Sequence, residues 1–156
     1  MSIYSKKWQT WIDSDLDSVW AFFSNPKNLD RITPEEMNFE ILSESDPGQM
    51  YEGMIISYRV RPLFKIPTTW VTEITRIKPK KYFVDEQRIG PYKMWHHEHH
   101  FEEKEDGVLM TDLLSYALPV APIGNLIAGK FISNKVENIF NFRNEAIAKY
   151  FPERKN

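Results

Sequence analysis

The hydrophobic and polar positions of the chain change their period twice along its length. Residues 3–12 are rich in aromatic and β-branched side chains and predict a strand, whereas apolar residues recur at helical spacing over residues 16–24. The carboxylate of Asp15 can accept from the free amides of that helix's first turn, which makes it a candidate N-cap. An Asn-Pro pair ends this helix, and residues 28–32 predict a second short one.

The middle of the chain predicts a series of strands separated by turns that contain Pro and Gly. Strands joined by such short connections pair with their neighbours in antiparallel fashion, so we expect a meander. The predicted strands cover residues 39–41, 55–60, 68–77, 82–89, 92–103 and 108–118.

The last third of the chain predicts one long amphipathic helix, because no Pro interrupts residues 124–150 and the apolar residues recur at 3.6 spacing. At 1.5 Å per residue this helix would be roughly 40 Å long, enough to cross a six-stranded sheet. We therefore expect residues 1–156 to form a single α+β domain, in which a curved antiparallel sheet of six to seven strands wraps around the helix. The apolar positions of the helix are Ala128, Ile132, Val136, Ile139, Phe140, Ile147 and Tyr150.

The composition adds a heavy aromatic load to this picture. The chain has 156 residues, of which 10 are Phe, 7 are Tyr and 5 are Trp. Each aromatic side chain can bury ~150–250 Å². Where a curved sheet bends away from a helix, large side chains fill the space or leave a cavity, and apolar cavities with a few polar groups are the usual small-molecule sites. The aromatic residues therefore indicate a cavity wall as well as a core.

Charge and residue usage exclude several classes of function. The 20 basic and 22 acidic residues leave a formal net charge of -2, which argues against nucleic-acid binding. The chain has no Cys, so disulfides, thiolate zinc sites and cysteine nucleophiles are excluded. No apolar run reaches the ~18 residues of a membrane span, and no nucleotide-binding or metalloprotease motif occurs. We expect a cytoplasmic protein, a monomer or homodimer, without stable membrane insertion.

All His residues of the chain lie in one predicted strand, in the run Trp95-His96-His97-Glu98-His99-His100-Phe101. Side chains alternate across a strand, so His97 and His99 share a face with Trp95 and Phe101. Two large aromatic residues favour the interior, which places both imidazoles inside. The remaining polar residues are expected to form a solvated face on which adventitious metal binding is realistic: His96, Glu98 and His100.

Two neighbouring strands add polar residues in the same alternation, Asp85 and Gln87 on one and Asp112 on the other. A buried carboxylate is costly alone, but pairing with His offsets much of that cost. The cluster can hold the polar end of a ligand or work in acid–base chemistry, with His97, His99 and Asp112 as candidate catalytic residues. The predicted ligand-binding set is Trp70, Phe83, Asp85, Gln87, Trp95, His97, His99, Phe101, Met110, Asp112, Leu114, Tyr116, Ile127 and Phe131.

Two other interpretations of the cluster stay open. The His and Asp side chains can form a satisfied internal network that binds nothing. Two His at positions i and i+2 with a carboxylate also match a known zinc ligand set. No other segment has metal-ligand spacing, so we expect neither a metal nor a cofactor.

A family resemblance is carried by five segments: Trp70-Val71-Thr72-Glu73-Ile74, Phe83-Val84-Asp85-Glu86-Gln87, Gly90-Pro91-Tyr92, Trp95-x-His97-x-His99-x-Phe101 and Asp112-x-x-x-Tyr116-x-Leu118-Pro119. Together they are similar to the START-like, or SRPBCC, superfamily, and within it to the bacterial polyketide cyclase/dehydrase-like ligand-binding group. The resemblance covers nearly the whole chain and implies the helix-grip fold, with a pocket between the sheet and the C-terminal helix. It supplies no catalytic role for His97, His99 or Asp112, because a fold constrains its activity only loosely.

Two functions from different classes follow from the cluster and the resemblance. The favoured one is binding, with transport or sensing, of a small, mostly hydrophobic ligand such as a lipid or an aromatic polyketide-like compound. The alternative is a cyclase, dehydratase or hydrolase that uses a cavity His as general acid or base. Catalysis needs at least one His nitrogen open to the pocket, so the structure can separate the two. Residues 120–131 form an apolar stretch that either packs as ordinary helix or acts as a mobile lip over the pocket.

Overall fold

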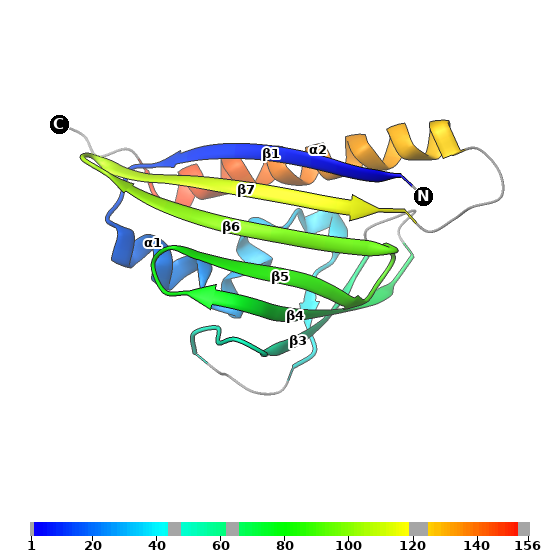
Figure 1. Ribbon diagram of the computed structural model, residues 1–156, viewed down its shortest axis with the longest axis horizontal. Helices are drawn as coiled ribbons and strands as arrows, with labels where there is room; N and C mark the ends of the chain where they lie inside the picture. The colour runs from blue at the N-terminus through cyan, green and yellow to red at the C-terminus, as the bar shows by residue number, and fades with distance from the viewer. Residues whose placement is uncertain (1, 44–47, 62–65, 119–124, 153–156) are drawn as a thin grey trace.

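In the described part of the chain, seven strands form one antiparallel sheet with the order β1-β7-β6-β5-β4-β3-β2 (Figure 1). The computed structural model describes residues 2–43, 48–61, 66–118 and 125–152, and it describes the side chains of the last helix from Gly129 onward. The first strand pairs with the last one, and the others follow as the predicted meander. The strands are β1 (Ile3–Ile12), β2 (Glu40–Ile41), β3 (Ile55–Val60), β4 (Thr68–Lys78), β5 (Tyr82–Ile89), β6 (Met94–Lys104) and β7 (Gly107–Ala117).

Short helices follow β1, and one long helix follows β7. The helix α1 (Leu16–Phe23) begins after Asp15, whose Oδ1 accepts from the Ser18 backbone N–H at 2.8 Å. The second predicted short helix, residues 28–32, falls within a succession of tight 3-10 turns; Pro26 begins the first of them and Pro34 precedes the third. These turns are η1 (Pro26–Asn28), η2 (Asp30–Ile32) and η3 (Glu35–Met37), and the long helix is α2 (Asn125–Tyr150).

The helix α2 lies against one face of the sheet and runs along β1 (Figure 1). Near the middle of α2, Phe140 stacks on the indole of Trp8 with ring centroids 3.7 Å apart. Glu137 accepts from Trp8 Nε1 at 2.9 Å. At the C-terminal end of the helix, the ring of Tyr150 contacts Phe22 of α1. The helix is thus fixed at β1 and at α1, which leaves room between it and the strands farther from β1.

The described residues form two clusters of buried hydrophobic side chains. One joins α1 to the sheet around Trp20, whose ring meets Phe101 edge-on at 5.5 Å. The other joins α2 to the sheet around Phe140 and Tyr116. The predicted α+β architecture, an antiparallel sheet with a long C-terminal helix and short helices after the first strand, is confirmed. Within the described ranges, no helix combines the length and the apolar composition that crossing a membrane requires.

Candidate functional site

A cavity of about 110 Å³ lies between the sheet, the 3-10 turns and α2. Because successive side chains of a strand point to opposite faces, every second residue of β4 reaches it: Trp70, Thr72 and Ile74, all buried. The rings of Trp70 and Trp95 meet edge to face, with centroids 5.2 Å apart. The apolar and aromatic part of the wall comprises Leu29, Met37, Phe39, Met50, Ile56, Val60, Trp70, Ile74, Phe83, Tyr92, Trp95 and Ile139.

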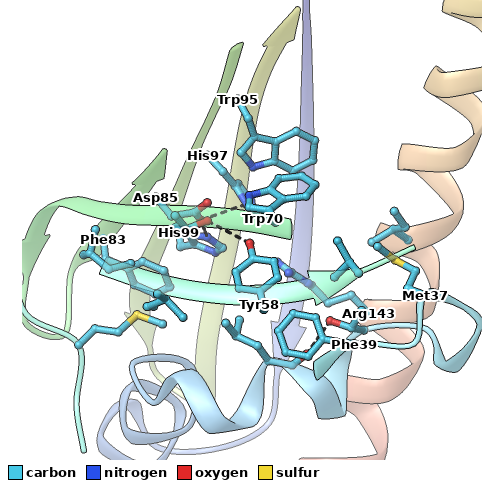
Figure 2. A pocket seen from close by; sticks show the side chains of 18 of the residues that line it. Met37, Phe39, Tyr58, Trp70, Phe83, Asp85, Trp95, His97, His99 and Arg143 are labelled. Atoms are coloured by element: carbon cyan, nitrogen blue, oxygen red, sulfur yellow. Dashed lines mark hydrogen bonds and ion pairs between the residues drawn. The ribbon is translucent and has the colours of Figure 1, made fainter. Parts of the chain in front are cut away.

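One part of the cavity wall is polar: in Figure 2, Asp85, His97 and His99 lie together, with Phe83 on one side and Trp70 and Trp95 on the other. In the strand register, Asp85 of β5 lies opposite His97 of β6, and His99 of β6 lies opposite Asp112 of β7. Asp85, His97 and His99 line the cavity, whereas Asp112 lies behind them and is 1% exposed. Antiparallel pairing alone therefore brings two carboxylates and two imidazoles into one buried layer.

Every imidazole nitrogen of this layer lies close to a carboxylate oxygen. His97 Nε2 is 2.8 Å from Asp112 Oδ1, and His99 Nε2 is 2.7 Å from Asp85 Oδ2. The other two nitrogens are less well placed. His97 Nδ1 lies 3.5 Å from Asp85 Oδ2, and His99 Nδ1 lies 3.1 Å from Asp112 Oδ1 without hydrogen-bond alignment. Because ionised carboxylates only accept, both Nε2 atoms are donors.

Arg143 of α2 completes the polar cluster, and sequence reasoning missed it. Its Nη1 lies 3.5 Å from Asp112 Oδ1, and its guanidinium carbon is 5.1 Å from the Phe140 ring centroid. Figure 2 shows the side chain reaching from the helix toward the two imidazoles. A signal was available: Arg143 comes four residues after Ile139 and four before Ile147, so it lies on the apolar stripe of the helix.

Tyr58 is a second wall residue that sequence reasoning missed. On β3 it alternates with solvent-facing positions in step with Ile56 and Val60, so strand alternation could have found it. Its hydroxyl lies 3.0 Å from Thr72 Oγ1. Burial and the nearby Asp85 carboxylate raise the pKa of the Tyr58 phenol above its ordinary value, so the phenol stays neutral.

Burial and pairing together set the charges of the cluster. Burial and the neighbouring His99 lower the pKa of His97 to about 4, so His97 is neutral near pH 7. Burial also opposes charge on His99, but the carboxylates of Asp112 and Asp85 outweigh it and raise the pKa of His99. For the two carboxyl groups burial favours the neutral form, yet the imidazoles outweigh it and hold both pKa values below normal. Both Asp carboxyl groups are thus ionised near pH 7, with the imidazoles beside them and Arg143 Nη1 3.5 Å from Asp112 Oδ1.

Of the predicted ligand-binding residues, six line the cavity: Trp70, Phe83, Asp85, Trp95, His97 and His99. Gln87 is instead tied to the turn that follows β5. Its Nε2 donates to the Tyr92 carbonyl at 2.7 Å, and its Oε1 accepts from the Tyr92 N–H at 3.2 Å. A Cβ at Gly90 would overlap Oε1 of Gln87, so glycine is required for this arrangement.

The other predicted residues lie in the core or outside the cavity. Those in the two hydrophobic clusters are Phe101, Met110, Leu114 and Tyr116. Phe131 is 40% exposed and borders an outer groove of about 690 Å³ between η3 and α2. Residues 120–124 of the predicted lip, residues 120–131, and the side chain of Ile127 lie outside what the structure describes.

The same arrangement of sheet and helix occurs in solved structures of low sequence identity. The Zhui aromatase/cyclase from Streptomyces sp. R1128 is 15% identical at a TM-score of 0.73, with 96% of this chain and 93% of that chain covered. The major latex-like protein 151 from Panax ginseng is 16% identical at a TM-score of 0.68, with 96% and 97% covered. Protein Ms6760 from Mycobacterium smegmatis is 11% identical at a TM-score of 0.72, with 97% and 93% covered. At these identities the likeness establishes the fold, which is the helix-grip fold expected from the sequence.

The sequence itself also matches a family. A search of curated proteins found no match. The model of the family described as polyketide cyclase/dehydrase and lipid transport matches residues 12–142, a range that includes β2 to β7 and most of α2. The resemblance drawn from the segments between residues 70 and 119 is thereby confirmed. The chain belongs to the polyketide cyclase/dehydrase and lipid transport family.

Proposed function

We propose that the protein binds a small, mostly hydrophobic molecule with one polar end in the cavity beneath α2, and that it holds this molecule rather than transforming it. The observation that carries the proposal is the division of the cavity wall. Aromatic and aliphatic side chains line most of it, while the charged and ionisable groups lie together on one part of it: Asp85, His97, His99 and Arg143. Cavities of this composition are the usual form of small-molecule sites.

Two donors on the wall have no hydrogen-bond partner within the described residues, Trp70 Nε1 and Arg143 Nε. A buried donor without an acceptor costs about 1–3 kcal/mol, so a ligand that supplies the acceptor removes that cost. Because the cluster already contains the carboxylates of Asp85 and Asp112, a neutral acceptor such as a carbonyl oxygen fits better than a third carboxylate. The apolar part of the ligand contributes ~25 cal/mol for each Å² removed from water.

The volume of the cavity limits what can enter it. An apolar cavity of ~150 Å³ holds one benzene ring. At about 110 Å³, this cavity accommodates a group of similar size and excludes a steroid or a long acyl chain. Met37 and Ile139 line both the cavity and the outer groove, so movement of these two side chains would connect the two spaces. We infer a ligand whose ring or short chain enters the cavity and whose remainder lies in the groove.

A catalytic role fits the geometry less well. General acid–base catalysis is most effective when the pKa of the group lies near the working pH. Burial holds the pKa of His97 at about 4, and His99 Nε2 already donates to Asp85. Neither imidazole is therefore an effective base at neutral pH, which favours binding over the cyclase, dehydratase or hydrolase alternative.

Acetophenone and ethylbenzene test the proposal, because they have the same ring and size and differ in one carbonyl oxygen. In ¹⁵N-labelled protein we expect acetophenone to move the indole N–H signals of Trp70 and Trp95, and ethylbenzene to move that of Trp70 less. Trp11 is 50% exposed and is the internal control, whose signal should not move. The variants Trp70→Phe, Trp95→Phe and Trp11→Phe assign the three signals.

Two outcomes would contradict the proposal. One is that neither probe moves Trp70 or Trp95 while mass spectrometry of the extracted protein finds no co-purified small molecule. The other is that Trp11 alone responds, which would mean that the probes partition onto the surface.

A further inference from the structure

The polar part of the cavity wall places a ring nitrogen close to a carboxylate oxygen. His97 Nε2 lies 2.8 Å from Asp112 Oδ1 and donates to it, because an ionised carboxylate only accepts. The other ring nitrogen of His97, Nδ1, lies 3.5 Å from Asp85 Oδ2.

This distance is the spacing of two ligands on one metal ion. Zn²⁺ binds imidazole nitrogen and carboxylate oxygen at ~2.0–2.2 Å, so two tetrahedral ligands lie ~3.3–3.5 Å apart. His99 points Nε2 at the same Asp85 oxygen, and the ligand atoms of the three side chains lie within 4.8 Å of one another. We propose that Asp85, His97 and His99 bind one divalent transition-metal ion through a carboxylate oxygen, His97 Nδ1 and His99 Nε2.

Binding exchanges one proton for the ion. The metal takes the place of the proton that His99 Nε2 donates to Asp85, and that proton leaves to solvent. The 2.7 Å contact between these two atoms then lengthens by about 0.6 Å to reach ligand spacing. A small rotation of the Asp85 carboxylate supplies this change, because its side chain is 17% exposed and faces the cavity.

Behind the three ligands, Asp112 provides the support that a metal site needs. A metal-bound His typically donates its second ring N–H to a carboxylate, which fixes the orientation of the ring. His97 Nε2 and His99 Nδ1 lie 2.8 and 3.1 Å from the same oxygen, Oδ1 of Asp112. The buried Nδ1 of His99 has no aligned partner within the described residues, and a rotation of the ring on coordination would align it.

The ligand set also selects the ion. Two nitrogens and one oxygen suit Zn²⁺, Co²⁺ or Fe²⁺, whereas Mg²⁺ and Ca²⁺ prefer oxygen ligands. Three protein ligands leave at least one coordination position open, and all three residues line the cavity, so that position faces a bound organic molecule. The inference goes beyond the proposed function and does not depend on it, because ion binding is measured without an organic ligand.

The experiment titrates chelator-treated protein with Zn²⁺ and with Co²⁺ and counts the bound ions by mass spectrometry. The outward face of β6 offers a matched control, because His96 and His100 are also histidines but are exposed to solvent. We expect one ion per chain in the natural sequence and in the double variant H96Q/H100Q. Loss of a supporting residue weakens metal sites about 10–100-fold, so loss of a ligand in H97Q or D85N should weaken binding at least about 100-fold.

The choice of variants keeps the fold intact. Gln at position 97 keeps a donor toward Asp112 and removes only the ring nitrogen that faces Asp85, and D85N keeps the shape of the carboxylate. In the natural sequence, Co²⁺ should broaden the methyl signals of the inward Leu114 and Ile74 before those of the outward Leu113.

Four results would overturn the proposal. Two of them exclude the assigned site: Zn²⁺ binds at no stoichiometric site, or both H97Q and D85N retain the ion. The other two identify an adventitious ion on the outward face: H96Q/H100Q loses the ion, or the Leu113 signals broaden first.

Discussion

The two faces of β6 each carry two His residues, and they differ chiefly in burial. His97 and His99 are 3% and 4% exposed, whereas the side chains of His96 and His100 are 36% and 40% exposed. Each face pairs its His residues with carboxylates at similar distances, 2.8 and 2.7 Å inside and 2.6 and 2.8 Å outside. The two faces of β6 therefore differ in the solvent exposure of their His residues and not in hydrogen-bond length.

The surroundings decide what each pair contributes to stability. Outside, water solvates a charge whose partner has been removed, so an exposed ion pair contributes about 0–1 kcal/mol. Inside, no water replaces the partner, and removal of one charge leaves the other uncompensated. Removal of one member should therefore destabilise the whole buried His–Asp network, whereas each outward His–Glu contact contributes to stability independently of the others.

The largest difference between the faces is expected on removal of a carboxylate charge. Asp112→Asn removes the carboxylate that both imidazoles and Arg143 contact, leaves Arg143 without this counter-charge and should lower the free energy of unfolding by about 3–5 kcal/mol. Glu98→Gln, the matched change outside, should lower it by less than about 1 kcal/mol. Urea denaturation at neutral pH measures the free energy of unfolding of both variants. Its slope against urea concentration is compared between variants to detect any change in the denatured state. Equal losses of stability in the two variants would contradict the inference that burial determines what each carboxylate contributes.

A second difference is expected in packing alone, on adjacent residues of β7. Leu114 faces inward and is 1% exposed, whereas Leu113 faces outward and is half-buried. Leu114→Ala removes buried methyl groups and leaves a cavity, which should cost about 2–4 kcal/mol. Leu113→Ala should cost about 1 kcal/mol or less, because water already reaches that side chain. The same urea titration measures both, and a loss from Leu113→Ala as large as that from Leu114→Ala would mean that the outward face is not a solvated surface.

Strand alternation accounts for most of what the sequence could predict. A pleat has a period of two, so His97 and His99 had to share a face whatever the register, and their aromatic neighbours favoured the inner one. Strands joined by short turns usually pair with each other, so the meander could be predicted. The long helix was predictable because residues 124–150 contain no Pro and keep one apolar stripe.

What escaped prediction depends on contacts between distant segments. The apolar stripe of the helix places Arg143 on the inward face, but its contact with Asp112 depends on the position of α2 over the sheet, which no local pattern specifies. Strand alternation predicted that Gln87 would line the cavity. Its side-chain amide instead hydrogen-bonds to the Tyr92 backbone in the turn that contains Gly90, a contact that alternation does not predict. The cavity volume follows from side-chain rotamers and from the position of α2, neither of which is encoded in a periodic pattern.

The smallest expected effect concerns pH and the outward His96. Partial burial opposes its charge, but Glu86 and Glu98 outweigh burial and raise the pKa of His96 above the ordinary 6.5. A raised pKa stabilises the folded state below pH 6.5, and this contribution is lost as the pH rises through the higher folded value. Because 36% of the side chain is exposed, H96Q should cost less than about 1 kcal/mol at pH 5.5 and nothing measurable at pH 8.5.

His97 should show the opposite sign, because burial lowers its pKa to about 4. The unfolded chain takes up this proton near pH 6.5 and the folded chain does not, so the folded state loses stability as the pH falls from 6.5 toward 4. Urea titrations of chelator-treated protein across this range measure both effects. The stability advantage of the natural sequence should shrink with rising pH against H96Q and with falling pH against H97Q. The same trend in both variants would mean that partner distance, rather than burial, governs the two faces of β6.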